Sequence, residues 1–271
     1  MTKDGVAEPV TCHQSQKFKL GFYRYYFKVL RSLGIKISRF SLGFNHGKLV
    51  FYLPTAYSER ALWNAEHVLV DCDYFQVVGA IPRPGDTVVD VGAFLGFYTA
   101  AASFLVGNEG KVYSLEPNKL VYPVLVENIH LNGFSAIHVY PLAVCPERGL
   151  RKLYVGEYPA VSSLSRDHVE RYTVVERELE VRCIKLSSLL KYIGYLDILK
   201  LDIEGLEREV LKEALGELTR TNTLVVEVHT DTADQGEVER VLGEAGFNRL
   251  VVYASSEMPH QVVVYAFREP C

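Results

Sequence analysis

The sequence predicts a doubly wound α/β domain, in which helices cover both faces of a mostly parallel sheet and an antiparallel hairpin forms one edge. Strand-like and helix-like patterns alternate from residue 87 onward with short connections, and parallel strands need crossovers of this kind. Only residues 255–260 separate the last two strand-like stretches, so we expect these two strands to be antiparallel. A chain of 271 residues is long enough to bury the core of such a sheet.

A basic amphipathic helix is predicted over residues 17–33. Its larger apolar side chains recur at helical spacing, as Phe18, Phe22, Tyr25, Val29 and Leu33. We expect this apolar face to pack on the body or over a ligand pocket, with the basic face in solvent. Residues 9–58 hold eight Lys or Arg and no acidic residue, although the chain's net charge is −4. Residues 17–39 could therefore also contact an anionic membrane surface or a phosphorylated ligand.

The remaining elements of the N-terminal appendage, residues 1–80, are a hairpin and a second helix. Two short apolar stretches within 39–53 flank an Asn-His-Gly turn, which predicts a β-hairpin. Residues 61–80 are predicted to be helical. The Pro-Arg-Pro-Gly turn at 82–85 fits neither a helix nor a central strand, so the main domain is predicted at 81–271.

Seven strands and four helices are predicted in this domain. The strands are expected at 87–91, 111–115, 137–144, 197–201, 224–228, 249–254 and 261–267. The helices are expected at 97–105, 120–131, 206–218 and 237–245. Between the third and fourth strands, residues 151–181 carry alternating patches that predict an extra hairpin.

Composition excludes several classes of protein. With 48% hydrophobic and 23% charged residues, the chain is neither disordered nor fibrous. Because no apolar run is long enough to cross a bilayer and no signal-peptide pattern is present, we expect a cytoplasmic location. The cysteines lack CxxC or Cys/His spacing, which disfavours a zinc site or a catalytic dithiol and predicts buried or incidental thiols. They are Cys12, Cys72, Cys145, Cys183 and Cys271.

The first predicted strand ends in a glycine loop that runs from Asp90 to Thr99. Gly92 and Gly96 let the backbone turn sharply and approach a ligand, while the Asp90 carboxylate can accept from an amine or a hydroxyl. Ligands of such sheets bind at the carboxyl ends of the strands. We therefore predict a cofactor site that includes Ala93 and Thr99 as well. The Gly-x-x-x-Gly spacing differs from the dinucleotide-binding pattern and disfavours NAD.

A carboxylate follows the second predicted strand, in Glu116-Pro117-Asn118. One carboxylate can accept from both hydroxyls of a ribose. Glu116 is therefore predicted to hold the ribose of a cofactor, with Pro117 and Asn118 beside it.

Five stretches, in this order along the chain, together resemble the FkbM-type class I methyltransferases. The stretch at 199–207, with its Lys-x-Asp-x-Glu-Gly-x-Glu pattern, is the most specific. The stretches are Asp90-Val-Gly-Ala-Phe-Leu-Gly-Phe-Tyr-Thr, Leu115-Glu-Pro-Asn, Glu127-Asn-Ile-His-Leu-Asn132, Leu199-Lys-Leu-Asp-Ile-Glu-Gly-Leu-Glu207 and Val226-Glu-Val-His229.

This resemblance implies a Rossmann-like, seven-stranded fold, S-adenosylmethionine as cofactor, and methyl transfer to an oxygen, often a hydroxyl of a sugar or a natural product. It places Asp90, Gly92 and Gly96 along the methionine and adenosine parts of the cofactor. Leu142 and Ala143 are expected to flank the adenine. The expected acceptor is a hydroxylated small molecule, a sugar or a lipid-linked glycan.

Polar residues end the fourth and fifth strands, which flank the cofactor's sulfonium in this topology. Asp202, Glu204 and His229 are predicted to surround the reacting hydroxyl, where a positioned base would remove its proton; Asp202 would also touch the cofactor. Alternatively, Asp202, Glu204 and Glu227 could hold Mg²⁺, which would lower the pKa of a bound alcohol. Glu207 is predicted to stabilise the start of the following helix.

Two other functions compete with O-methylation. An RNA methyltransferase could use the basic N-terminal segment to bind phosphates, but the acidic body and the lack of an Asn-Pro-Pro-Tyr motif make nucleic acid the less favoured partner. A non-catalytic cofactor-binding module is disfavoured because Asp202 and Glu204 accompany a complete glycine loop. The sequence does not distinguish acceptors, since acceptor pockets vary freely on a shared fold.

Overall fold

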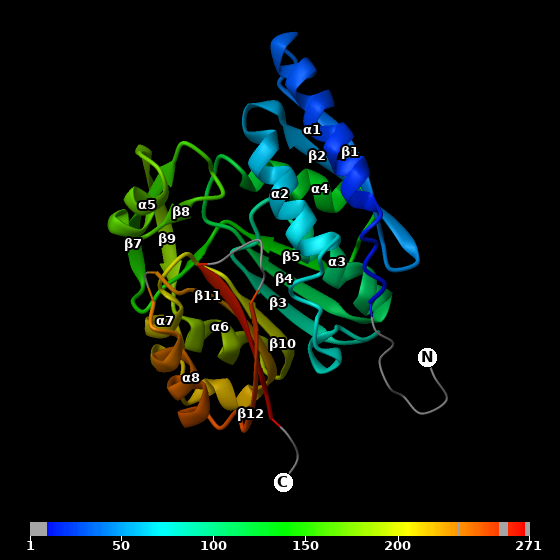
Figure 1. The fold of residues 1–271 in the computed structure, drawn as a ribbon. Helices are drawn as coiled ribbons and strands as arrows, with labels where there is room; N and C mark the ends of the chain where they lie inside the picture. Colours follow the sequence, from blue (N-terminus) through cyan, green and yellow to red (C-terminus); the bar gives the residue numbers. More distant parts are fainter. Residues whose placement is uncertain (1–9, 232, 255–259, 269–271) are drawn as a thin grey trace.

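The computed structural model describes residues 10–231, 233–254 and 260–268. Its centre is a seven-stranded sheet (Figure 1) with the strand order β12-β13-β11-β10-β3-β4-β5. The strands are β3 (Thr87–Val91), β4 (Lys111–Leu115), β5 (Ile137–Tyr140), β10 (Leu196–Leu201), β11 (Thr221–His229), β12 (Arg249–Ala254) and β13 (Gln261–Phe267). Neighbouring strands from β5 to β11 are parallel, and β13 runs antiparallel to β11 and β12. The predicted sheet and its edge hairpin are confirmed.

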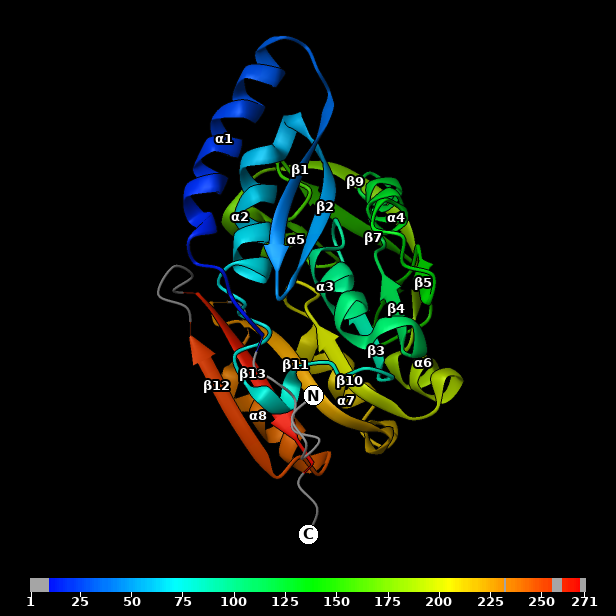
Figure 2. The same cartoon turned by 90° about the vertical axis from the view of Figure 1, so that its right-hand side faces the viewer.

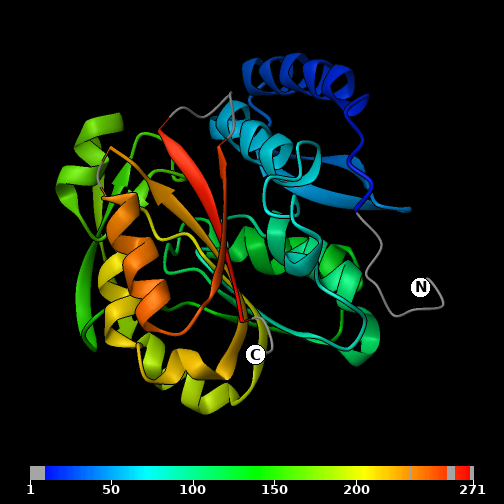
Figure 3. The same ribbon diagram turned by 60° about the horizontal axis from the view of Figure 1, so that its bottom comes forward.

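Helices cover both faces of the sheet, which passes between them in Figure 3. One face carries α2 (Ser58–Leu69), α3 (Phe97–Val106) and α4 (Tyr122–Leu131), and the other carries α6 (Leu186–Ile193), α7 (Glu207–Glu213) and α8 (Gln235–Glu244). Successive side chains of a strand point to opposite faces of the sheet. On β3, Val88 belongs to one core cluster, while Val89 and Val91 belong to the other.

The predicted third strand is two strands in two sheets. β5 ends at Tyr140, and β6 (Ala143–Val144) begins a separate four-stranded sheet. Pro141 lies between them and lacks the N–H that a continuous ladder would need. The insertion supplies the rest of this sheet, with β7 (Gly149–Gly156), β8 (Ser162–Ser163) and β9 (Val175–Ile184), together with α5 (Arg166–Tyr172).

The N-terminal appendage consists of α1 (Gln16–Ser32), a hairpin of β1 (Ile37–Phe44) and β2 (Gly47–Pro54), and α2. The second helix ends at Leu69 and not at the predicted residue 80, because Cys72 adopts a left-handed conformation with φ 59°. Figure 2 shows the hairpin against α3 and α4. Side chains of the hairpin and of the main domain share one core cluster, Phe51 and Phe97 being in edge-to-face contact.

Two asparagines, one in α4 and one at its C-terminal cap, hold the outer edge of β2. Asn128 accepts from the backbone N–H of Tyr52 at 2.6 Å and donates to the Leu95 carbonyl at 2.9 Å. Asn132 accepts from the N–H of Val50 at 2.9 Å and donates to the carbonyl of the same residue at 2.7 Å. Side chains thereby form the hydrogen bonds that the backbone N–H and C=O groups of this strand edge would otherwise lack. These asparagines belong to the stretch at 127–132 that contributed to the family resemblance.

The expected orientation of the first helix was wrong. The face that packs on the body carries Leu20, Phe27 and Leu30, which are buried. The predicted packing face is instead exposed, and its members are Phe18, Phe22, Tyr25, Val29 and Leu33. The helix has two apolar rows, and periodicity alone does not tell which row faces the protein.

Four of the cysteines form two disulfides, Cys12–Cys72 and Cys145–Cys183, so the expectation of incidental thiols was wrong. Cys271 lies outside the described residues. The pairs are 60 and 38 residues apart in sequence, which is why spacing did not reveal them. Such bonds persist in oxidising compartments and in the cytoplasm of hyperthermophiles. No helix within the described ranges is long and apolar enough to cross a membrane.

The disulfides are expected to stabilise the fold. Replacing Cys145 and Cys183 together with serine should lower the free energy of unfolding by about 2–4 kcal/mol, because the unfolded chain regains the entropy that the closed loop removed. Denaturant unfolding of the oxidised protein and of the double variant measures this difference. Equal midpoints for both proteins would contradict it.

Candidate active site

A cavity of about 420 Å³ opens at the carboxyl ends of β3, β4, β10 and β11. This volume is in the range of small-molecule sites. The strand ends contribute Gly92, Glu116, Asp202 and His229 to its wall. The insertion lines the opposite wall with residues 158–164, and α2 contributes a third side.

The glycine loop meets the end of β10 too closely for any other residue at position 92. Gly92 has φ 81°, and a Cβ there would lie 1.7 Å from the backbone oxygen of Asp202. Its own carbonyl accepts from Lys200 Nζ at 2.9 Å. Gly96 has φ 87°, and a Cβ there would lie 2.5 Å from Leu125 of α4. Gly92 thus shapes the cavity wall, whereas Gly96 lets α3 and α4 pack.

Several predicted cofactor residues of the glycine loop do not line the cavity. Asp90 is fully buried, accepts from Thr99 Oγ1 at 2.6 Å and lies 3.3 Å from Lys200 Nζ. Ala93 and Gly96 are likewise outside the wall. Asp90 therefore joins β3 to the start of α3 and to Lys200, and it does not itself face the cavity.

Glu116 fixes the outer side of the same loop. Its two carboxylate oxygens accept from the backbone N–H groups of Phe94 and Asn118, each at 2.7 Å. Burial raises the pKa of Glu116 to about 7, although both backbone hydrogen bonds act to lower it. Pro117 lines the cavity, and Asn118 is buried behind it and donates to Ser162 Oγ at 3.0 Å.

The predicted adenine-side residues, Leu142 and Ala143, both line the cavity between β5 and β6. They present an apolar surface, with Leu153 of β7 in the same wall. A flat apolar slot of this kind suits an aromatic base.

A buried lysine, which the sequence analysis did not assign to the site, organises the carboxylates. Lys200 Nζ lies 3.2 Å from Asp202 Oδ2 and 3.3 Å from Asp90 Oδ1. Burial would lower its pKa, but the charges of Asp202 and Asp90 raise it above the ordinary value, so the side chain stays cationic. A charge within an otherwise apolar strand is the signal that could have revealed this role, because lysine is almost never fully buried without a partner.

Asp202 lines the cavity. Lys200 Nζ donates to its Oδ2 at 3.2 Å, and Tyr74 Oη lies 3.3 Å from the same oxygen. Oδ1 is buried and has no hydrogen-bond partner within the described part of the chain. Burial raises the pKa of Asp202 to about 7, against the lowering effect of Lys200.

Residues from α2 and the loop after it complete the site, and the sequence analysis had not included them. Tyr74 Oη donates to Glu227, which also lies 3.4 Å from His67 Nε2 and 3.9 Å from His229 Nε2. His67 Nδ1 lies 2.5 Å from Asp73 Oδ2. Burial would raise the pKa of Glu227, but hydrogen bonding and the charge of His67 lower it to about 2.

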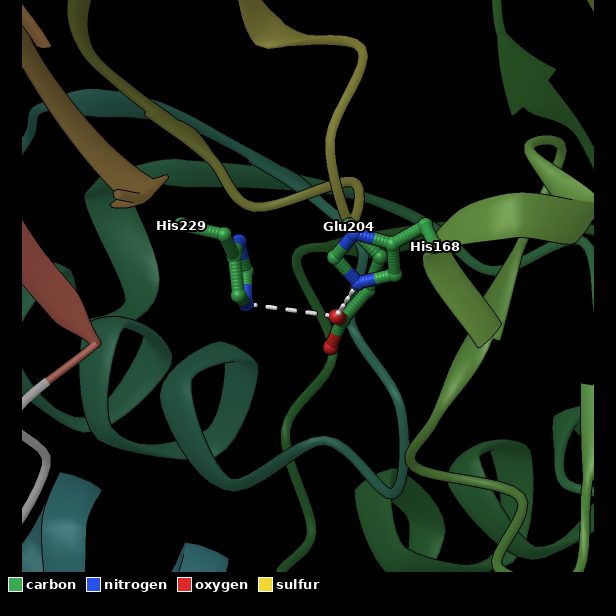
Figure 4. Close-up of side chains that lie close together, drawn as sticks. All are labelled: His168, Glu204 and His229. Atoms are coloured by element: carbon green, nitrogen blue, oxygen red, sulfur yellow. Dashed lines mark hydrogen bonds and ion pairs between the residues drawn. The ribbon is translucent and has the colours of Figure 1, made fainter. Parts of the chain in front are cut away.

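Two histidines converge on Glu204 (Figure 4). His168 Nε2 of α5 and His229 Nε2 at the end of β11 lie 2.7 Å and 3.2 Å from the same Glu204 oxygen. Glu204 has φ 58°, a conformation that costs a non-glycine residue about 1–3 kcal/mol. Its backbone carbonyl accepts from Ser163 Oγ at 2.7 Å. Burial would lower the pKa of His229, but the nearby carboxylates, Glu204 foremost, raise it to about 9.

The three carboxylates predicted to share Mg²⁺ do not form a common group. Among the described residues, donor atoms close enough to share a metal ion belong to His168, Glu204 and His229, or to Asp202, Glu207 and His229. Imidazole nitrogens suit zinc or other transition metals better than Mg²⁺, which prefers oxygen ligands. Mg²⁺ therefore gains no support from the geometry.

Glu207 has a structural role in the loop before α7. Its buried carboxylate accepts from the backbone N–H groups of Ile203 and Gly205 at 3.0–3.1 Å, at the start of α7. The loop that carries Glu204 is thereby held in place.

Together, the glycine loop, the buried carboxylate after the second strand of the domain and the acidic end of β10 define a class I S-adenosylmethionine-dependent methyltransferase. The methyltransferase FkbM domain matches residues 90–249, and the chain belongs to that family.

Two curated relatives and one solved structure illustrate the similarity. The 31-O-demethyl-FK506 methyltransferase FkbM of Streptomyces tacrolimicus is 27% identical over 214 residues, 66% of this chain and 80% of that protein. The hexuronic acid methyltransferase AglP of Haloferax volcanii is 23% identical over 193 residues, 70% of this chain and 75% of that protein. An S-adenosylmethionine-dependent O-methyltransferase structure from Thermotoga maritima has a TM-score of 0.49 and 15% identity, covering 86% of this chain and 78% of its own.

Proposed function

We propose that the protein transfers a methyl group to a hydroxyl of a sugar, a lipid-linked glycan or a small molecule. The observation that carries this proposal is Asp202, which lines the cavity and whose carboxylate oxygen Oδ1 is buried without a hydrogen-bond partner among the described residues. Buried acceptors are almost always satisfied, so we assign this oxygen to the hydroxyl of the acceptor. The names of both curated relatives, an O-demethyl-FK506 and a hexuronic acid methyltransferase, agree with such an acceptor.

The cavity fits the cofactor on three sides. Glu116 would hold the ribose hydroxyls, the backbone at Gly92 would lie along the methionine part, and Leu142 with Ala143 would flank the adenine. When bound, S-adenosylmethionine supplies an activated methyl group. What remains for the protein is to align the acceptor and to take up its proton.

Asp202 is the group placed to take up that proton. Lys200 holds Oδ2, which fixes the carboxylate, and we assign the unpartnered Oδ1 to the acceptor. His229 lines the same wall, but its Nε2 is engaged by Glu204 at 3.2 Å. We therefore assign proton removal to Asp202 and orientation of the acceptor to the His168–Glu204–His229 group.

The outer part of the cavity suits a sugar with an acidic group. Arg60 of α2 lies over the Tyr158 ring at 5.1 Å and near Trp63 at 6.0 Å, and all three line the cavity. Aromatic faces bind the apolar faces of sugar rings, and a guanidinium binds a carboxylate bidentately. A hexuronic acid is the simplest acceptor that offers both features.

The test is transfer of labelled methyl groups from S-adenosylmethionine to hexuronic acid glycosides, with matched neutral hexosides as controls. We expect product with the acidic series and a preference for it that Arg60→Gln removes. Product only on RNA, or cofactor binding without transfer to any acceptor of a broad hydroxyl panel, would overturn the assignment.

Cofactor affinity should depend on the ionisation of Glu116. Because burial raises its pKa to about 7, the carboxyl is protonated below that pH and accepts fewer hydrogen bonds from a ribose. Affinity for S-adenosylmethionine is therefore expected to rise as pH increases through 7 and to level off above it. Calorimetry between about pH 5.5 and 8.5 measures this dependence.

The matched control is Glu116→Gln, which keeps the size of the side chain but does not titrate. It should bind about 1–3 kcal/mol more weakly at pH 8 and lose the dependence near pH 7. The same rise with pH in the glutamine variant would show that another group is responsible.

A further inference from the structure

The first helix exposes a continuous apolar stripe to solvent. Phe18 is 90% exposed, Tyr25 is 68% exposed and Leu33 is 69% exposed, and Phe22 and Val29 lie between them on the same side of α1. Ile35 and Ile37, in the segment after the helix, are exposed as well. Apolar side chains that are exposed singly need no explanation, but a continuous row marks an interaction surface.

This stripe (Phe18, Phe22, Tyr25, Val29 and Leu33) lies on the outside of the molecule. In Figures 1, 2 and 3, α1 forms an outer edge, with α2 and the β1–β2 hairpin on its inner side. The opposite face of the helix packs through Leu20, Phe27 and Leu30. The helix is therefore anchored by one apolar face while it presents the other.

Positive charge borders the stripe. Lys28 and Arg31 on the helix, and Lys36 and Arg39 after it, are exposed and have no ion-pair partner in the part of the chain that the structure describes. Lys17 and Arg24 lie on the same helix face as Lys28 and pair with acidic groups at α2, including Glu66. The basic charge that α1 and the segment after it expose to solvent is thus unneutralised and of one sign.

The sign of this charge argues against a second copy of the chain as the partner. A two-fold dimer through the stripe would bring the basic residues of one copy close to the same residues of the other copy. Residues 10–58 contain no acidic group that could compensate this charge. Like charges placed together across an interface are unfavourable. The surface therefore fits a partner that has an apolar interior and negatively charged groups at its surface.

We propose that α1 docks the protein on an anionic lipid bilayer, with the stripe inserted at the level of the headgroups and the basic residues against the phosphates. Helices with aromatic and aliphatic residues on one face and Lys or Arg beside them bind membranes in this way. The helix lies in the plane of the interface and does not span the bilayer. This docking is independent of the acceptor assignment, although it would bring a lipid-linked acceptor to the enzyme.

Co-sedimentation with vesicles tests the proposal. The full chain is mixed with phosphatidylcholine vesicles that contain about one-third phosphatidylglycerol, and with pure phosphatidylcholine vesicles. We expect binding to the anionic vesicles that weakens steeply with salt. The triple variant Phe18→Ser, Phe22→Ser, Tyr25→Ser should lose at least about 100-fold in partitioning, because three large side chains no longer insert.

Two controls distinguish docking through the stripe from nonspecific hydrophobic binding. Lys28→Glu with Arg31→Glu should lower partitioning about 10-fold or more through charge alone. Tyr192→Ser with Tyr195→Ser removes two equally exposed aromatic residues at α6, on the opposite face of the sheet, and should bind as the native protein does. Affinity for S-adenosylmethionine should be unchanged in all variants, which shows that they are folded.

Three results would overturn the proposal. The first is no binding of the native protein to anionic vesicles at low salt, and the second is equal binding of the native protein and the stripe variant. The third is a concentration-dependent dimer of the native protein where the stripe variant is a monomer. Methyl transfer to soluble acceptors is measured separately, so failure of membrane docking is distinguishable from failure of the proposed activity.

Discussion

Replacing Asp202 with asparagine is expected to lower the rate constant of methyl transfer by about 10²- to 10⁴-fold, the usual contribution of a positioned base. The substitution keeps the shape of the side chain but removes the proton acceptor at Oδ1. Affinity for S-adenosylmethionine should change little, because the ribose and adenine parts of the cavity are formed by other strands. Single-turnover rates and calorimetry measure the two quantities.

Asp197→Asn is the matched control for this experiment. Asp197 is at the opposite end of β10, where its carboxylate accepts from the backbone N–H of Thr87 at 2.8 Å. Loss of that hydrogen bond should affect stability and leave the transfer rate near the native value. Full activity of Asp202→Asn on an acceptor that the native enzyme methylates would refute the assignment of Asp202.

Replacing Gly92 with alanine is expected to abolish cofactor binding and to destabilise the fold by about 3 kcal/mol or more. The added Cβ would lie 1.7 Å from the backbone oxygen of Asp202, and the residue has φ 81°. The left-handed conformation alone costs about 1–2 kcal/mol, and the backbone contact forces β3 and β10 apart at their ends. Thermal unfolding and cofactor titration measure both effects.

Gly133→Ala separates these two contributions. Gly133 has φ 71°, but nothing lies within 4 Å of an added Cβ. It should therefore show the conformational cost alone and retain native affinity for S-adenosylmethionine. If Gly92→Ala is no more destabilising than Gly133→Ala, the close approach of the two strands is not what requires glycine at position 92.

The central sheet and part of its ligand wall could be predicted from local sequence. Strand periodicity, the glycine loop and the polar residues after each strand are short-range signals. The carboxyl ends of parallel strands meet at one edge of a sheet, so the strand pattern alone predicts that Glu116, Asp202 and His229 share one cavity. Pro141, by contrast, was a local signal for the break between β5 and β6 that the prediction of one continuous strand did not use.

The sequence by itself determined the order of the strands along the chain, the glycine loop and the carboxylates at the strand ends, because a backbone conformation and a strand end depend on neighbouring residues. Only the tertiary structure decided which row of α1 faces solvent and which cysteines pair. It also decided that Lys200, His67, Tyr74 and His168 surround the predicted carboxylates. These relations join segments that are up to 160 residues apart, as His67 and Glu227 are. Such contacts depend on how whole elements pack, and no local pattern encodes that packing.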